Sequence, residues 1–212
     1  MVSEESMNTP SAFVPSDPLI SPRYRVSAWQ RAKANDDWPL MVCIFKDRLN
    51  GRFLEPIKLI EQDAVIGPFA GFSILALDCL LIETLSQFYQ GFDETPQDHQ
   101  KQFWLFFKGS EYFKGHFTRK AAETFYSHVR CGLLHQAQTK KQTFIRADQP
   151  TMIQPTNGSP SNGIIVDRAR FHQALEQEFT SYAAKLERGS EADSGLRANF
   201  LRKMQMICGE VQ

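Results

Sequence analysis

The chain has 212 residues, of which 42% are hydrophobic and 23% are charged, and this composition is typical of a globular protein rather than a disordered or fibrous one. Its 24 Lys and Arg residues balance its 24 Asp and Glu residues, so the net charge of zero excludes the bulk positive charge of a general nucleic-acid coat protein. A single domain of this length buries enough surface to fold without metal ions or disulfides.

Four cysteines lie far apart and form no pair at the spacing of metal ligands: Cys43, Cys79, Cys131 and Cys208. We therefore expect reduced thiols and no structural metal. No secretory signal is recognisable, which fits a reducing cytoplasm. No stretch approaches the roughly 18 to 20 apolar residues of a membrane-spanning helix, so we expect a soluble, cytoplasmic protein without a membrane partner.

The N-terminal part of the chain predicts a short tail followed by helices. Residues 1–21 are rich in Ser and Pro and lack both a basic start and a continuous apolar run, which predicts a disordered tail. Residues 22–212 are expected to form a single helical domain, and a weakly helical pattern over 24–35 begins it.

Capping signals mark the next two helices. Asp36-Asp37 before Trp38-Pro39 predicts a helix start, with an N-cap and a first-turn proline. Asn50–Gly51 predicts the end of this helix. A short helix over 52–63 follows until Gly67–Pro68 breaks it.

The longest apolar segment, residues 70–92, repeats its large side chains at helical rather than alternating intervals and predicts a core helix. A loop over 93–96 leads to a helix over 97–108. The aromatic cluster over 103–113 is either part of the core, which its helical spacing favours, or a platform for stacking bases. Thr118 is expected to cap a helix that runs to about residue 138.

Helical periodicity disappears over 142–166, where short β-prone runs alternate with Pro and Asn-Gly turns. We expect a small β-hairpin there, inserted between helices. Asp167 caps a long helix, and a basic amphipathic helix over 196–207 ends the chain. The predicted fold class is mainly α, a helical bundle with a small β-hairpin insertion.

Arg130 and His135 stand five residues apart in the helix before this insertion. A guanidinium is a permanently charged fork that binds phosphate, and an imidazole exchanges a proton near neutral pH. Together they meet the needs of cleaving RNA through its own 2′-hydroxyl, without a metal ion or another cofactor. Five residues on a regular α-helix rotate the side chain by about 140°, so the two groups do not share a face. A bend at Gly132 or a two-fold dimer would bring them together, and we favour the dimer.

The segment Arg130-Cys131-Gly132-Leu133-Leu134-His135 resembles the motif of the HEPN superfamily, an Arg, four to six residues and a His on a late helix of a small helical bundle. The resemblance implies a HEPN-like core over about residues 70–190 and a homodimer with facing motifs. It also implies a metal-independent endoribonuclease or an RNA-binding relative, of the kind found in toxin–antitoxin and antiviral defence systems, with an antitoxin or defence protein as a further partner. On this resemblance, His135 is the acid/base and Arg130 stabilises the charge of the transition state.

Asp78 is a polar residue on the apolar face of the 70–92 helix, whereas Glu83 projects to the other side. Because burial of an unpaired carboxylate is costly, Asp78 needs a partner. Pairing with Arg130 or His135 would make it a third catalytic residue that orients the other two. Pairing with another Arg or a backbone amide would make its role structural.

Several residues around the motif are candidates for RNA contacts. Lys140, Lys141 and Arg146 follow the motif helix closely and are candidate phosphate contacts, although a solvated face explains them equally well. Tyr126 either stacks on a base or fills the core. His128 is expected to have a surface or packing role.

The other histidines have no acidic or Cys companion at metal spacing and are expected to be solvated or locally bonded: His99, His116 and His172. The competing functional interpretation is a non-catalytic module that binds RNA, a nucleotide or a protein through the dimer and the hairpin. A small-molecule hydrolase finds no support, because the chain has no nucleophile elbow and no phosphate-binding loop.

Overall fold

The computed structural model describes residues 17–94 and 96–209. Most of the predicted tail, residues 1–16, lies outside the described residues. Residues 17–21 do not continue a disordered tail, because Ile20 is buried and the Ser21 hydroxyl donates to the Asp47 carboxylate at 2.7 Å. The buried carboxylate of Asp47 therefore holds this end of the predicted tail in a defined position.

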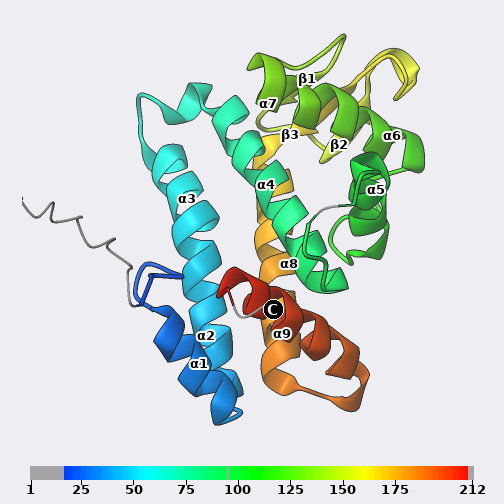
Figure 1. Ribbon diagram of the computed structural model, residues 1–212. Helices are drawn as coiled ribbons and strands as arrows, with labels where there is room; N and C mark the ends of the chain where they lie inside the picture. Colours follow the sequence, from blue (N-terminus) through cyan, green and yellow to red (C-terminus); the bar gives the residue numbers. More distant parts are fainter. Residues whose placement is uncertain (1–16, 95, 210–212) are drawn as a thin grey trace, which may run out of the picture.

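The described part of the chain is mainly helical (Figure 1). The α-helices are α1 (Val26–Ala34), α2 (Trp38–Leu49), α3 (Glu55–Gln62), α4 (Gly71–Gln90), α5 (His99–Gly109), α6 (Arg119–Thr124), α7 (Cys131–Gln136), α8 (Arg168–Arg188) and α9 (Ser194–Ile207). Two π-helical turns, η1 (Asn50–Leu54) and η3 (Phe125–Arg130), and three 3₁₀ turns, η2 (Gly67–Phe69), η4 (Thr156–Gly158) and η5 (Glu191–Asp193), complete the helical elements. The predicted mainly helical class is confirmed.

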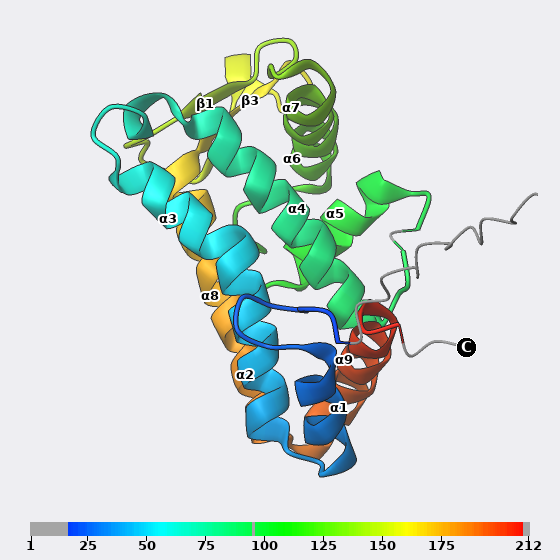
Figure 2. The ribbon, with the colours of Figure 1, turned by 60° about the vertical axis from the view of Figure 1, so that its left-hand side comes forward.

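The predicted start of α2 is confirmed, but its predicted end is wrong. Asp37 caps α2 by accepting the backbone N–H of Leu40 at 3.0 Å. At Asn50–Gly51 the chain continues through η1 into α3, and Figure 2 shows α2 and α3 as one long rod. Gly51 serves close packing instead, since a Cβ there would lie 2.3 Å from Cγ of Pro22.

Helix α4 is the predicted core helix and lies among α5, α8 and α9 (Figures 1 and 2). It ends at Gly91, which adopts the left-handed conformation that terminates helices (φ 65°). Contrary to our expectation, length and composition alone would let α4 cross a membrane, and it is the one such helix in residues 17–94 and 96–209. Half of that apolar stretch is buried inside the protein, which is consistent with the core helix of a soluble protein.

The helix predicted from Thr118 to about residue 138 consists of α6, η3 and α7. The Thr118 hydroxyl accepts the N–H of Ala121 at 3.1 Å, which confirms the predicted cap. The π-helical η3 ends at Arg130, and α7 continues as a regular α-helix until Ala137 turns left-handed (φ 51°).

The predicted hairpin is a three-stranded sheet instead. Its strands are β1 (Phe144–Arg146), β2 (Ile153–Pro155) and β3 (Ile164–Asp167), in the order β1-β3-β2. β2 and β3 are antiparallel, as in a hairpin, but β1 pairs with β3 in parallel, with Ile145 opposite Val166. Asp167 then caps α8 by accepting the N–H of Arg170 at 2.8 Å, as predicted.

Aromatic side chains fill the core in two groups. One group surrounds Phe45 of α2, whose ring centroid lies 4.8 Å from that of Phe88 on α4 and 5.4 Å from that of Phe200 on α9. The other lies between α5, η3 and α8, where the rings of Phe125 and Phe171 stack at 4.9 Å. The aromatic residues of α5 belong to this second group, so packing explains them rather than base stacking.

Candidate functional site

The guanidinium of Arg130 is held by Glu83, at the place where η3 meets α4. Nε of Arg130 donates to Oε1 of Glu83 at 2.7 Å, and the side chains are only 15% and 14% exposed. Burial acts to lower the pKa of Arg130, but the hydrogen bond and the charge of Glu83 outweigh it and raise this pKa above its usual value. Arg130 is therefore a fixed positive charge.

Tyr126 is a second neighbour of the Arg130 guanidinium, besides Glu83. The centre of the guanidinium lies 5.7 Å from the centroid of the Tyr126 ring, at cation–π distance. Within residues 17–94 and 96–209, no hydrogen bond occupies its two terminal nitrogens. Glu83 thus orients the group through Nε while the fork stays available for a bidentate acceptor such as a phosphate.

Glu83 was not among the residues proposed from the sequence. Helical projection placed it correctly away from Asp78, on the polar side of α4, but could not show that η3 covers this side. The missed signal was a carboxylate on a core helix together with an arginine on a later one. Their separation of 47 positions hides the pair from any local reading of the sequence.

His135 lies in the last turn of α7 and is exposed. Because α7 is a regular α-helix from Cys131 onward, His135 is rotated away from Arg130 as calculated, and no described contact joins the two. Two exposed leucines flank the Arg130–Glu83 pair by helical spacing, Leu80 one turn before Glu83 and Leu134 one turn after Arg130. Within one chain, Arg130 and His135 therefore do not form a common site.

Asp78 is fully buried, as predicted, but neither proposed catalytic partner contacts it. Its Oδ1 lies 2.8 Å from Nδ1 of His172 on α8, so the proposed coupling of Asp78 to Arg130 or His135 is wrong. The expectation that His172 is solvated or bonded only locally is wrong as well, since it is 4% exposed and pairs with a residue 94 positions away. Helix α8, not η3, covers the apolar face of α4 at this point.

The Asp78–His172 pair is electrostatically coupled. Burial raises the pKa of Asp78 to about 6, and the hydrogen bond from His172 opposes this rise. For His172, burial acts to lower the pKa, but the bond to Asp78 outweighs it and raises the pKa above its usual value. The pair joins α4 to α8 in the core, with Glu176 3.7 Å from Nε2 of His172.

Gly132 does not bend the motif helix. It lies in the regular α7, and a Cβ there would sit 2.4 Å from the carbonyl oxygen of Gln138, so the glycine admits the returning loop. That loop brings Lys140 back to η3, where its N–H donates to the carbonyl of His128 at 3.0 Å. His128 is buried and its Nδ1 lies 3.1 Å from the Thr143 hydroxyl, which confirms a packing role.

The candidate RNA contacts do not form one cluster. Burial, followed by the charges of Lys141 and Lys140, lowers the pKa of His128, so these lysines lie on the His128 side of η3. Arg146 is exposed in β1, beside Ile145, which packs against the first residue of α4. Glu83 lies twelve residues after Gly71, the first residue of α4, which is about 18 Å along the helix. Arg146 is therefore separated from the Arg130–Glu83 pair.

Tyr126 has a packing role together with a contact to the motif. Its ring centroid is 5.4 Å from that of Phe103. Burial and the neighbouring Cys131 raise the pKa of Tyr126 to about 12, so the phenol is neutral at physiological pH. Tyr126 thus packs against Phe103 and lies at cation–π distance from the guanidinium of Arg130.

Residues 17–94 and 96–209 contain no cluster of three or more His, Cys, Asp or Glu side chains that could hold a metal ion. All four cysteines are free thiols, and Cys79 is fully buried, which raises its pKa well above the usual value. Comparisons of the chain with protein-family models, with curated proteins and with solved structures give no match.

Proposed function

We propose that the protein is a cytoplasmic, metal-independent endoribonuclease of HEPN type that acts as a homodimer. The observation that carries this proposal is the guanidinium of Arg130, which Glu83 holds through Nε while its terminal nitrogens face no described acceptor. An arginine held in this way is preorganised to bind a phosphate and the additional charge of its transition state.

The reaction needs only the side chains of the motif and the RNA. His135 removes the proton of a 2′-hydroxyl, and the 2′-oxygen forms a bond to the adjacent phosphorus. The bond from phosphorus to the 5′-oxygen breaks, and this oxygen takes up a proton from an imidazolium. The products are a 2′,3′-cyclic phosphate and a free 5′-hydroxyl, while Arg130 stabilises the charge of the pentavalent phosphorus.

A second copy supplies what one chain lacks. Leu80 is 38% exposed and Leu134 is 36% exposed, and they flank the Arg130–Glu83 pair. Contact of two copies through these leucines buries apolar surface around the pair. The two-fold axis then brings the partner's His135 to Arg130, which removes the obstacle of the 140° rotation within one helix.

The test is cleavage of a mixed RNA pool in the presence of EDTA. We expect fragments that end in cyclic phosphate, and loss of these fragments in His135→Ala and Arg130→Ala. His116→Ala is the matched control, since it removes another exposed imidazole and should leave cleavage unchanged. Intact RNA with the wild-type protein would refute the nuclease and favour the binding module.

Mixing the two inactive variants tests the shared site. In a dimer of one Arg130→Ala chain and one His135→Ala chain, one of the two sites is complete. Random exchange should therefore restore about a quarter of the wild-type rate. No recovery after verified exchange would refute a site built from one Arg and the partner's His.

Lys140 and Lys141, on the His128 side of η3, are proposed contacts for other phosphates of the same RNA. Changing both to Ala should reduce the slope of log K against log salt by about 1.4 for single-stranded RNA, because each phosphate contact contributes about 0.7. Fluorescence anisotropy with the inactive His135→Ala protein measures this slope. An unchanged slope would remove both lysines from the RNA-binding surface.

A further inference from the structure

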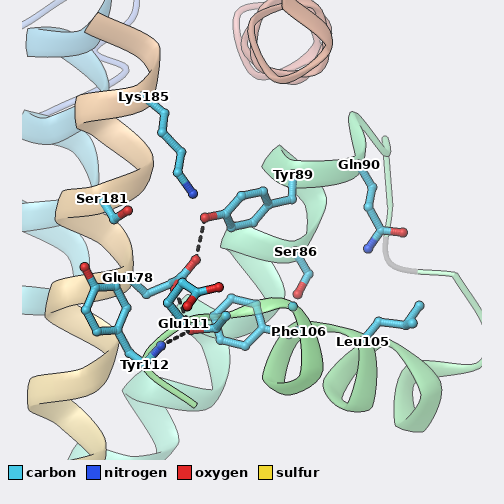
Figure 3. A pocket seen from close by; sticks show the side chains of 12 residues that line it. Ser86, Tyr89, Gln90, Leu105, Phe106, Glu111, Tyr112, Glu178, Ser181 and Lys185 are labelled. Atoms are coloured by element: carbon cyan, nitrogen blue, oxygen red, sulfur yellow. Dashed lines mark hydrogen bonds between the residues drawn. The ribbon is translucent and has the colours of Figure 1, made fainter. Parts of the chain in front are cut away.

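A cavity of about 310 Å³ opens between α4, α8 and the C-terminal end of α5 with the turn that follows it (Figure 3). Its volume lies at the lower end of the range for small-molecule sites. None of the motif residues lines it. The chemistry of its walls is therefore independent of the nuclease proposed above.

A carboxylate lies at the inner end of this cavity. Glu178 of α8 is 5% exposed and accepts hydrogen bonds from two hydroxyls, that of Tyr89 and that of Ser110, the latter at 2.5 Å. Within the described part of the chain, Glu178 forms no ion pair with a Lys, Arg or His. Two neutral donors compensate a buried negative charge only in part, so a cationic group that enters the cavity gains a strong partner.

A positive charge faces the same cavity. Lys185 lies seven residues after Glu178 and therefore on the same face of α8, and helical side chains point back toward the N-terminus of their helix. Figure 3 shows its ammonium directed into the cavity on the side of Tyr89. The other acidic residue of the lining, Glu111, is already paired with Lys114 at 2.5 Å.

The remaining wall is apolar. Leu105 and Phe106 of α5 line it, and the ring of Tyr112 closes one side. Phe106 is buried and Leu105 is 40% exposed, so this wall extends from the interior to the mouth. A buried anion, a cation and an apolar wall thus surround one space that is large enough for a small molecule.

We propose that this cavity binds a free α-amino acid with an apolar side chain. The ammonium of the amino acid pairs with Glu178, its carboxylate pairs with Lys185, and its side chain packs against Leu105 and Phe106. A simple amine would leave Lys185 without a partner and close to a second cation, and a simple carboxylate would face Glu178. The zwitterion satisfies both charges of the cavity at once.

Isothermal titration calorimetry with three matched sets of compounds tests this proposal. The amino acids are L-leucine and L-phenylalanine. The amines that lack the carboxylate are 3-methylbutylamine and phenethylamine, and the acids that lack the ammonium are 4-methylpentanoate and 3-phenylpropionate. We expect at least one amino acid to bind with Kd below about 1 mM, and its two analogues to bind at least about tenfold more weakly.

Variants of the full chain assign the two charges. Lys185→Gln should weaken binding of the amino acid about tenfold, and Glu178→Gln should weaken it at least as much. Glu187→Gln is the matched control, because it removes an exposed carboxylate from the same helix outside the cavity and should leave the affinity unchanged. Circular dichroism shows whether each variant is folded, and Lys185→Gln remains decisive if Glu178→Gln is not.

Two results would overturn the proposal. One is the absence of measurable binding of both amino acids. The other is equal binding of an amino acid and its amine, with no effect of Lys185→Gln. No RNA enters this assay, so its outcome is distinct from that of the nuclease test.

Discussion

Removal of His172 should destabilise the protein strongly, because it leaves the carboxylate of Asp78 without its hydrogen-bonding partner in the core. Oδ1 of Asp78 would lose the bond from Nδ1 of His172, and Oδ2 has no hydrogen-bond partner among residues 17–94 and 96–209. Loss of one partner from a buried pair of this kind typically costs about 3–5 kcal/mol of unfolding free energy. We expect that cost for His172→Leu near neutral pH.

The raised pKa of Asp78 sets a minimum for the cost of its charge once His172 is removed, and it gives a sign for the pH dependence. Burial raises it from 3.8 to about 6 even with His172 present. At about 1.36 kcal/mol per pKa unit, the ionised carboxylate costs roughly 3 kcal/mol relative to the unfolded chain. Because the raised pKa means that the folded state binds a proton more readily than the unfolded state, this cost applies above the folded pKa and disappears as the pH falls toward 4.

A second substitution isolates this effect. In Asp78→Asn/His172→Leu, an amide of nearly the same shape replaces the carboxylate and cannot ionise. At about pH 8 the double variant should be more stable than His172→Leu by at least about 3 kcal/mol, and at about pH 4 the two should agree within about 1 kcal/mol. The comparison cancels every other titrating group, since both proteins contain the same ones.

Urea unfolding followed by circular dichroism, at pH values from about 4 to 8, measures these free energies. His135→Leu is the control for the loss of an imidazole, and because its side chain is exposed it should change stability by less than about 0.5 kcal/mol. Two outcomes would refute the reasoning: His172→Leu as stable as the wild type at pH 8, or a gap between the single and double variants that is constant with pH.

Three further substitutions test the packing that positions the motif and the helices. Gly132→Ala should cost about 1–3 kcal/mol in thermal unfolding, because the new methyl group would meet the carbonyl of Gln138; a gain in stability, as at an open helical glycine, would contradict this contact. Asp167→Ala removes acceptors from the N–H groups of Arg170 and Gln149 and should cost about 2–3 kcal/mol in urea, whereas a loss below about 0.5 kcal/mol would show that the cap is dispensable. Phe45→Ala should cost about 3–5 kcal/mol in the same assay, since its fully buried ring joins α2 to α4 and α9, and a smaller loss would mean that the neighbouring rings refill the space.

Features that depend on a few neighbouring residues could be predicted from the sequence. Asp37, Thr118 and Asp167 each cap the helix that was predicted to start beside them, because a cap involves only atoms within three residues. Helical spacing identified α4 as the core helix and the side of it that buries Asp78, since burial of a face follows from its apolar residues. The short strands were also located, because β-branched runs between turn residues are a local signal.

The partners of the buried charged residues, and the close contacts between distant segments, are decided by how the helices pack in the tertiary structure. Asp78 pairs with His172 and Arg130 with Glu83, across 94 and 47 positions, and neither choice is visible until α8 and η3 are placed against α4. The parallel pairing of β1 with β3 and the close contact at Gly51 likewise involve segments that the chain does not join directly. Short-range patterns specify where an element begins and which of its faces is buried. Which residue pairs with a buried charged group depends on how whole helices are arranged. Burying that group is costly unless the arrangement brings a hydrogen-bonding partner to it.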